Sequence, residues 1–360
     1  MITRSDTLAR AAAIRAVFEA QGAMVVEPPI LQSAETLLDL YGEEIRARAY
    51  VTSDALRGEQ MLRPDFTVPV VQMHMAHGAD PARYTYSGEV FRRQEHDEDR
   101  ANEYLQVGYE VFDRSDPAAA DAEVFALIAG TVAHLDMRAV TGDIGILMAA
   151  VTALQTSAPR KAALMRHIWR PRRFRALLDR YSGRSPVPEA RRALLAGETA
   201  ESDAPLIGRR GPDEIAARIE TLRADAEAAP LSEQEVGLIE ILLNIQGTLP
   251  GALEQLRDVA VDLPAIAPAV ARVAARRDAL AARGIDVDRL PFDTSYGRTS
   301  MEYYDGFVFG FHSRTRPDLP VVATGGRYDA LTRRLGRGAE IPAVGGVVRP
   351  GLMLELEALT

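Results

Sequence analysis

The residues best suited to binding a charged ligand lie within or beside strand-like runs of apolar residues. Glu110 lies inside the run Val107–Phe112, and a carboxylate that is buried among apolar neighbours needs a partner. Arg92 follows an aromatic-rich run, although it could instead form a surface ion pair worth at most about 1 kcal/mol. Tyr303 and Tyr304 are adjacent in a third run, where one of them could belong to the core because neighbouring strand residues face opposite sides. The sequence therefore predicts a polar pocket around Glu110.

Other kinds of site chemistry lack the residues that they need. The chain has no cysteine, which excludes disulfides, thiolate zinc sites, iron–sulfur ligation and thiol nucleophiles. Lys161 is the only lysine and is followed by Ala162, so a P-loop is absent and a Schiff base would have to use a lysine at a helix start. His74 and His77 could suggest a metal pair, but no third ligand stands out and we expect helix-surface or core histidines. We expect no catalytic residue, no metal and no cofactor.

Two strands joined by a long charged loop dominate the first part of the chain. Tyr84–Phe91 and Tyr104–Phe112 are rich in aromatic and β-branched residues, which favour strands. The loop Arg92–Asn102 between them predicts an antiparallel pair that carries a functional loop. An amphipathic helix is expected over Ala118–Leu135. Strand character returns near the C-terminus, at residues 301–311, 320–324 and 344–348.

The middle of the chain has a different pattern. From about Pro159 to Arg283 the signal is almost purely helical, and clusters of Pro, Gly and Ser separate the helical pieces. The length of 360 residues suggests about two domains. We therefore predict a core formed by residues 1–157 and 285–360, with a helical insertion over residues 158–284.

The overall composition is that of an ordinary globular protein. Apolar residues make up 47% of the chain, and 51 acidic against 42 basic side chains give a net charge of −9. This balance argues mildly against a general nucleic-acid binder, which needs clustered positive charge. The N-terminus lacks the apolar stretch of a signal peptide, and no run reaches the roughly 18 to 20 apolar residues of a membrane helix. We expect a cytoplasmic protein without a membrane span.

Five segments carry a pattern that is more specific than any of them alone. In chain order they are Gly22-x5-Pro28-Pro29-Ile30-Leu31; Leu62-Arg63-Pro64-Asp65-Phe66-Thr67; Phe91-Arg92-Arg93 followed by Gln106-Val107-Gly108-Tyr109-Glu110-Val111-Phe112; Glu302-Tyr303-Tyr304-x-Gly306-x-Val308-Phe309; and Gly325-Gly326-Arg327-Tyr328-Asp329-Ala330-Leu331. In this order the chain resembles the catalytic core of histidyl-tRNA synthetases. The resemblance covers roughly residues 1–157 and 285–349.

The resemblance implies an α+β fold of the class II aminoacyl-tRNA synthetase type, with a mostly antiparallel sheet flanked by helices. It implies a homodimer whose interface includes Pro29. It also implies a histidine pocket whose residues have assigned roles. Asp65, Thr67 and Gln106 would hold the α-ammonium group, Glu110 and Tyr303 would hold the imidazole with Tyr304 beside them, and Arg92 would face the carboxylate.

The chain departs from the synthetase pattern where ATP would bind. Thr299 stands in the place of the catalytic arginine, while Arg298 is one residue away and would face the opposite side of a strand. Leu352 stands in the place of the arginine that holds the γ-phosphate. Arginine neutralises phosphate charge with a fixed fork, and losing one such charge costs roughly 3 kcal/mol or more of transition-state stabilisation. We therefore expect no adenylate formation.

Two further departures concern the pocket and the tRNA. Asp65 is one methylene shorter than the family's glutamate and Phe66 replaces a glycine, so the pocket could be smaller or shifted. Eight residues follow Leu352, whereas a domain needs at least about 50. We therefore expect no anticodon-binding domain.

A chain that keeps the histidine pocket but lacks the arginines that bind ATP resembles the regulatory subunit of ATP phosphoribosyltransferase. The resemblance implies a non-catalytic subunit that activates a short-form catalytic subunit in the first step of histidine biosynthesis. It implies partnership with that subunit, a homodimer within a hetero-oligomer, and L-histidine as the effector of feedback inhibition. The loop Arg92–Asn102 is our candidate for the element that orders when histidine binds.

Two other functions remain open. One is a truncated amino-acid-activating enzyme that uses Arg298 in an altered register. The other is a tRNA-binding regulator that uses the stretch Arg160–Arg184, which carries nine basic residues, one acidic residue, Trp169 and Phe174. This stretch could equally be a solvated helical face or a protein contact.

Overall fold

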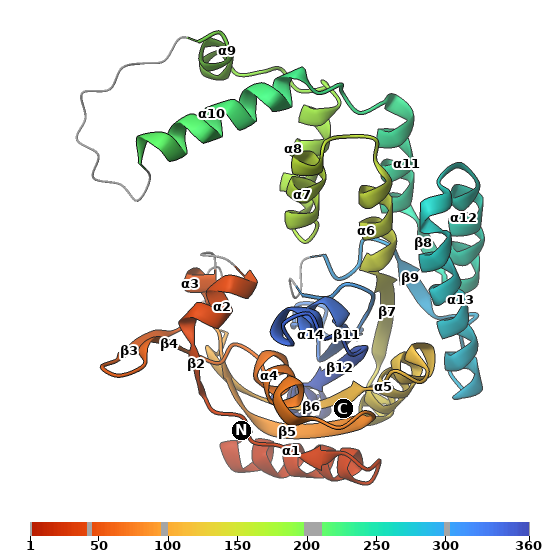
Figure 1. Ribbon diagram of the computed structural model, residues 1–360. Coiled ribbons are helices and arrows are strands. Elements are labelled where there is room, and N and C mark those ends of the chain that lie inside the picture. The colour runs from red at the N-terminus through yellow and green to blue at the C-terminus, as the bar shows by residue number, and fades with distance from the viewer. Residues whose placement is uncertain (1, 42–44, 95–99, 198–210, 299–302, 360) are drawn as a thin grey trace.

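A nine-stranded sheet forms the centre of the molecule (Figure 1). The computed structural model describes residues 2–41, 45–94, 100–197, 211–298 and 303–359. The strand order is β1-β5-β6-β12-β11-β10-β7-β9-β8, and neighbouring strands are antiparallel except for the pairs β1–β5 and β7–β9. Their bounds are β1 Met24–Val25, β5 Ala82–Phe91, β6 Glu103–Phe112, β7 Met137–Asp143, β8 Gln246–Thr248, β9 Pro291–Asp293, β10 Phe307–Ser313, β11 Ala323–Arg327 and β12 Ala343–Val348.

The long hairpin of β5 and β6 confirms the strand pair predicted from the sequence. Its register places Tyr84 opposite Glu110 and Gly88 opposite Gln106. β12 lies on the other side of β6, with Gly345 opposite Glu110. Glu110 therefore lies in the middle of a sheet with a strand on each side, which explains why apolar residues flank it in the sequence.

A second, three-stranded sheet stands apart from the large one. Its order is β2-β4-β3, and both pairs are antiparallel. Short helices accompany it, and the N-terminal helix lies against β5 and β6 (Figure 1). The bounds are α1 Arg4–Glu19, β2 Leu31–Ser33, α2 Ala34–Tyr41, α3 Ile45–Arg48, β3 Val51–Asp54, β4 Gly58–Leu62 and α4 Thr67–His77.

The helix that follows β6 is close to its predicted position. α5 spans Pro117–Val132, and Asp116 caps it by accepting a hydrogen bond from the backbone of Ala119 at 3.0 Å. It packs against β12, β11 and α13 Ala267–Ala282. The helix α14 Asp329–Leu335 lies between β11 and β12, and α15 Pro350–Glu357 follows β12.

Among the described residues, the middle segment is helical as predicted, apart from one short strand, β8. β8 pairs with β9 at the edge of the large sheet, because the short stretch after α11 can add main-chain hydrogen bonds to an open edge. Figure 1 shows α9 and α10 far from the large sheet and α12 and α13 beside it. The division into a core and an insertion over residues 158–284 stays a prediction. The helices are α6 Ile144–Ala153, α7 Ala158–Arg166, α8 Pro171–Tyr181, α9 Glu189–Leu195, α10 Pro212–Glu227, α11 Glu233–Asn244, α12 Leu249–Asp262 and the 3₁₀ turn η1 Pro264–Ile266.

Two C-terminal strands begin later than predicted. β10 begins at Phe307 and β11 at Ala323. The residues before β10 form a turn instead, because the backbone N–H of Asp305 donates to the carbonyl of Arg327 at 3.0 Å. The Asp305 side chain then accepts hydrogen bonds from the first backbone N–H groups of α14. The predicted start at Met301, and Thr299, lie outside the described residues.

Candidate functional site

All seven residues predicted to bind histidine line one cavity of about 650 Å³. They come from four places in the fold: the turn into α4, the end of β5, the strand β6 and the turn before β10. Asp65, Thr67, Arg92, Gln106, Glu110, Tyr303 and Tyr304 form this group. The shared cavity supports the geometry of the prediction, while histidine binding itself stays a prediction.

Glu110 lines the cavity and is held by hydroxyl groups. Its side chain is 1% exposed. Thr67 and Tyr86 donate to one carboxylate oxygen at 3.0 and 2.8 Å, and Tyr328 donates to the other at 2.5 Å. Burial raises the pKa of Glu110 to about 7, although the three hydroxyls oppose this shift. A carboxylate offers about four acceptor positions, so one remains for a ligand.

Asp65 is the second carboxyl group that lines the cavity. It accepts a hydrogen bond from the hydroxyl of Tyr41 at 3.1 Å and one from the backbone of Val68 at 3.2 Å. Burial raises the pKa of Asp65, and the positive charge of Arg92 opposes that shift. The Nε of Arg92 donates to the carbonyl of Pro64 at 2.7 Å. Asp65 and Arg92 therefore attract each other electrostatically inside the cavity.

Gln106 carries the clearest signal that the cavity receives a hydrogen-bond donor. Its side chain is buried, and its Oε1 has no hydrogen-bond partner among the described residues. A buried polar atom without a partner costs about 1 to 3 kcal/mol and calls for an explanation. An ammonium group in the cavity would supply the missing donor.

Tyr303 and Tyr304 both line the cavity, as the predicted site requires, so the alternative that one of them is only a core residue is not needed. They lie in the turn before β10 and not on a strand, so the alternation of strand side chains does not apply. Their rings meet edge to face with centroids 5.0 Å apart. Burial raises the pKa of both phenols, which keeps them neutral hydrogen-bonding groups.

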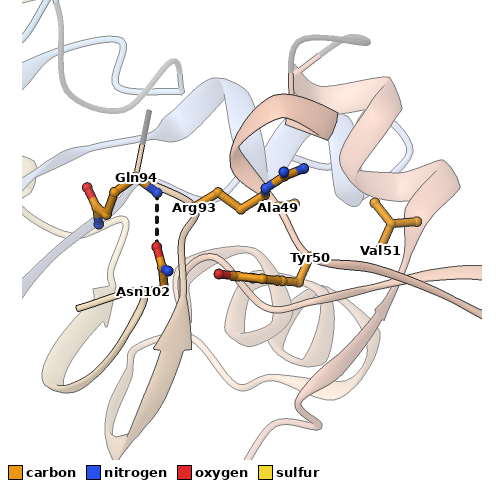
Figure 2. A pocket seen from close by; sticks show the side chains of 6 residues that line it. All are labelled: Ala49, Tyr50, Val51, Arg93, Gln94 and Asn102. Carbon is orange, nitrogen blue, oxygen red and sulfur yellow. Dashed lines mark hydrogen bonds between the residues drawn. The ribbon is translucent and has the colours of Figure 1, made fainter. Parts of the chain in front are cut away.

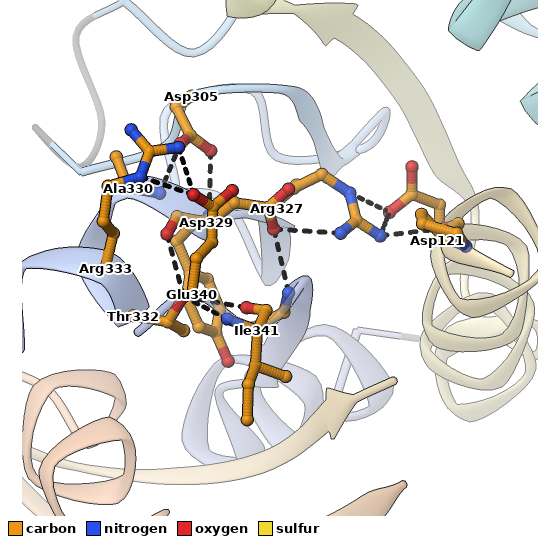
Figure 3. A network of polar contacts seen from close by, with 12 residues as sticks. Asp121, Asp305, Arg327, Asp329, Ala330, Thr332, Arg333, Glu340 and Ile341 are labelled. Carbon is orange, nitrogen blue, oxygen red and sulfur yellow. Dashed lines mark hydrogen bonds and ion pairs between the residues drawn. The ribbon is translucent and has the colours of Figure 1, made fainter. Parts of the chain in front are cut away.

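A buried ionic network fixes the turn that carries these tyrosines (Figure 3). Arg327 donates to Asp121 at 2.7 Å and to Asp329 at 3.0 Å. The carboxylate of Asp305, next to Tyr304, accepts from the backbone of Asp329 and Ala330 at 3.0 and 2.5 Å. The motif Gly325-Gly326-Arg327-Tyr328-Asp329 thus supports the site through Arg327 and Asp329 and contacts Glu110 through Tyr328.

The sequence did not identify several residues that shape the cavity. Tyr41, Tyr86 and Tyr328 hold the two carboxyl groups, and no spacing rule joins them to Asp65 or Glu110. Arg349 also lines the cavity, and its Nε has no acceptor among the described residues.

Arg298 lines the cavity as well, which contradicts the expectation that it would face away. The reason is that Arg298 lies in a turn after β9 and not on a strand.

Two further hollows lie beside the charged loop after β5. The larger, of about 1020 Å³, shares Arg92 and Arg349 with the main cavity and includes Leu352. The smaller, of about 510 Å³, lies where the backbone N–H of Gln94 donates to the side chain of Asn102 at 3.0 Å (Figure 2). Residues 95–99 of the loop lie outside the described residues, so its ordering by a ligand stays a prediction.

Ion pairs within the helical segment account for much of the basic stretch Arg160–Arg184. Asp225 on α10 contacts Arg160 and Arg180 at 2.6 and 3.1 Å. Glu240 on α11 contacts two further arginines of the stretch, Arg175 and Arg184, at 3.0 and 2.9 Å. These contacts favour a structural role for the stretch.

His74 is a core histidine, as expected. Its ring stacks on Phe112 with centroids 3.8 Å apart, and its Nδ1 is 3.0 Å from the hydroxyl of Tyr84. Burial lowers the pKa of His74 to about 4. Within the described ranges, no group of three His, Cys, Asp or Glu residues could hold a metal ion, and no helix is long and apolar enough to cross a membrane.

Comparison with known proteins agrees with this fold. The family model described as histidyl-tRNA synthetase matches residues 4–224 and 215–350. A structure titled an ATP phosphoribosyltransferase regulatory subunit/histidyl-tRNA synthetase from Bacillus halodurans has a TM-score of 0.68 at 20% identity, over 98% of this chain and 79% of its own. A histidyl-tRNA synthetase from Nostoc has a TM-score of 0.64 at 18% identity, over 98% and 71% of the two chains. The fold is that of the histidyl-tRNA synthetases.

Sequence relatives identify the family to which the chain belongs within this fold class. Proteins named ATP phosphoribosyltransferase regulatory subunit from Brucella anthropi and Brucella canis are each 32% identical to this chain, over 92% of it and 93% of their own length. The chain belongs to the family of ATP phosphoribosyltransferase regulatory subunits.

Proposed function

We propose that this chain is a non-catalytic subunit that activates a short-form ATP phosphoribosyltransferase and relays feedback inhibition by histidine. The observation that carries the proposal is the single cavity that joins Asp65, Gln106 and Glu110 with Arg92. Histidine presents an ammonium group, a carboxylate and a ring with polar atoms, and this set of side chains complements all three. Membership of the regulatory-subunit family supplies the partner.

Each part of histidine has a matching group in the cavity. The ammonium group would meet Asp65, Thr67 and the unpaired oxygen of Gln106. The imidazole would meet the remaining acceptor position of Glu110 and the hydroxyl of Tyr303, with Tyr304 beside it, and Arg92 would be available to the carboxylate. A buried polar pocket rejects analogues that leave its groups unpaired by orders of magnitude. Alanine, which lacks the ring, is therefore expected to bind far more weakly than histidine.

We further propose a cytoplasmic hetero-oligomer that contains a homodimer of this chain. The segment from β1 to β2 presents apolar side chains to solvent, with Met24 59% and Leu31 47% exposed. Apolar residues that gather on a surface mark interaction sites, and Pro29 lies within this segment. Sedimentation velocity should show a dimer, and Leu31→Glu should shift it toward the monomer.

The deciding experiment for the function is reconstitution with a short-form catalytic subunit. Co-purification, a rise in phosphoribosyltransferase activity and its inhibition by histidine are expected. Failure to raise that activity would count against the proposal. Histidine-dependent exchange between ATP and pyrophosphate would instead support the truncated enzyme, and steeply salt-dependent tRNA binding would support the RNA-binding regulator.

A further inference from the structure

Arg298 is a buried cation without a carboxylate partner among the residues that the structure describes. It is 4% exposed and lines the main cavity. Its Nη2 has no hydrogen-bond partner among the described residues. Burial and the nearby charge of Arg175 lower its pKa to about 10, and no described carboxylate opposes that shift. A buried guanidinium of this kind is costly unless an anion joins it.

The helical segment holds Arg298 in place. The Nε of Arg298 donates to the carbonyl of Ile168 at 2.7 Å, and its guanidinium carbon lies 4.8 Å from the centre of the Phe174 ring. Ile168 lies in the turn between α7 and α8, and Phe174 lies on α8. Pro171, the first residue of α8, lines the cavity. The turn between α7 and α8 therefore forms part of the cavity wall.

A second contact joins the same turn to the tyrosines. The indole N–H of Trp169 donates to the backbone carbonyl of Tyr304 at 3.2 Å. Two adjacent residues of the helical segment, Ile168 and Trp169, thus contact Arg298 and Tyr304 respectively. This pair of contacts connects the ligand-facing residues to a segment that the sequence separates from them by more than 120 positions.

The other cations of the cavity are already engaged or less buried. The Nε of Arg92 donates to the carbonyl of Pro64, and the negative charge of Asp65 stabilises the charged form of Arg92. Because Arg92 already compensates the negative charge of Asp65, it offers a ligand carboxylate less uncompensated positive charge than Arg298 does. Arg349 is half-buried, and its guanidinium carbon is 5.4 Å from the centre of the Tyr104 ring. Arg298 is the fully buried cation of this cavity without a carboxylate partner among the described residues.

We propose that Arg298, held by the turn between α7 and α8, is the specificity-determining cation for the carboxylate of the bound amino acid. Trp169 is then a positioning residue that acts through the Tyr304 backbone. The inference rests on the proposed histidine site and adds a consequence. Because ligand and helical segment share one guanidinium, occupation of the cavity and the position of α7–α8 are thermodynamically linked.

The test compares histidine with histidinol, which lacks the carboxylate, by calorimetry on the full chain. Wild type should prefer histidine by about 10-fold or more, the scale of one charged hydrogen bond. Arg298→Met should lose about 10- to 100-fold in histidine affinity and less than about 2-fold in histidinol affinity. Arg298→Lys keeps the charge without the fork and should recover part of the preference. Thermal unfolding confirms that each variant is folded.

Two further variants separate positioning from binding. Trp169→Phe removes the N–H donor and should weaken both ligands equally, by about 3- to 10-fold, while deuterium uptake at residues 303–306 rises. Arg175→Met removes an exposed cation from α8 and should leave both affinities within about 2-fold of wild type.

Each outcome points to one conclusion. An unchanged preference for histidine over histidinol in both Arg298 variants would overturn the assignment, and the same loss of preference in Arg349→Met alone would give the role to Arg349. If Arg298→Met fails to fold, the ratio of histidine affinity to histidinol affinity in Arg298→Lys decides the question. Wild-type protein that binds neither ligand would refute the proposed histidine site instead.

Discussion

Glu110 shows how burial and hydrogen bonding act on one side chain. Three hydroxyls, from α4, from β5 and from the residue between β11 and α14, surround it, yet desolvation raises its pKa to about 7. The apolar neighbours of Glu110 in the sequence predicted its burial correctly. Its partners could not be predicted, because Tyr86 and Tyr328 are 24 and 218 residues away and only the tertiary fold brings them together.

The raised pKa of Glu110 predicts a pH dependence of stability. A glutamate whose pKa rises from 4.5 to about 7 on folding binds an extra proton between those values, so its contribution is full below pH 4.5 and is lost as pH rises through 7. Glu110→Gln cannot titrate. Its free energy of unfolding should therefore fall less than that of wild type between pH 5 and 8, by up to roughly 3 kcal/mol. Urea denaturation at both pH values measures this.

Comparison with wild type at each pH removes the contributions that both proteins share, including that of Asp305, whose pKa burial also raises to about 7. Glu59→Gln changes an exposed carboxyl group and should leave the wild-type pH dependence in place. Identical pH profiles for Glu110→Gln and wild type would show that Glu110 does not gain a proton on folding.

Close contact between neighbouring strands explains a glycine at the site. A Cβ built on Gly345 would lie 1.4 Å from Oε2 of Glu110, so Gly345→Ala must displace the carboxylate or separate β12 from β6. We expect a loss of stability of about 1 to 3 kcal/mol together with loss of histidine binding. Urea denaturation and calorimetry measure the two effects.

Gly251→Ala is the control for the Gly345 substitution. A Cβ at Gly251, on α12, would meet only Thr248, at 3.4 Å. Because alanine favours helix, this variant should be unchanged or stabilised by up to about 1 kcal/mol. Normal histidine binding by Gly345→Ala would show that the Glu110 carboxylate can move without consequence.

The helix α13 illustrates what pattern analysis can and cannot predict about elements. Its helical character was correctly predicted, but its role was not. Arg276, buried on α13, donates to Asp121 at 2.7 Å and to Asp143 at 2.9 Å, and so joins the end of the helical segment to α5 and β7. Sequence periodicity identifies a helix and its apolar face, whereas a single long-range ion pair leaves no periodic signal.

Removal of Arg276 should be strongly destabilising. Arg276→Met removes the cation that pairs with the buried Asp143, while Asp121 keeps its ion pair with Arg327. Breaking a buried ion pair on one side costs about 3 to 5 kcal/mol. Arg277→Met, on the same helix, removes only an exposed pair with Asp278, which is worth at most about 1 kcal/mol. Urea denaturation of both variants tests this, and equal stabilities would show that the Arg276 network is not needed to join α13 to the sheet.

At the scale of the whole molecule, the order of the motifs predicted the fold better than any local signal. The five short segments predicted a mostly antiparallel sheet and a pocket, and the structure places the seven predicted residues in one cavity. The contacts between the helical segment and that cavity were not foreseen. Ile168 contributes its backbone carbonyl and Trp169 its indole N–H. Every residue has a backbone carbonyl, so the residue type at position 168 does not indicate this contact.

Regulation by histidine would have to be reciprocal at this scale. If histidine binds the assembled complex with an affinity different from that for the lone chain, the catalytic subunit must bind the histidine-loaded chain with an affinity changed by the same factor. Couplings of about 1 to 3 kcal/mol, or roughly 5- to 150-fold, are typical.

Calorimetry of histidine with the lone chain and with the complex gives the first factor. Calorimetry of the catalytic subunit with this chain, with and without saturating histidine, gives the second factor independently. Alanine has the charged backbone without the imidazole and should change neither. Two unequal factors would mean that a further equilibrium, such as dissociation of the dimer, takes part; two factors of one would mean that histidine does not regulate assembly through this chain.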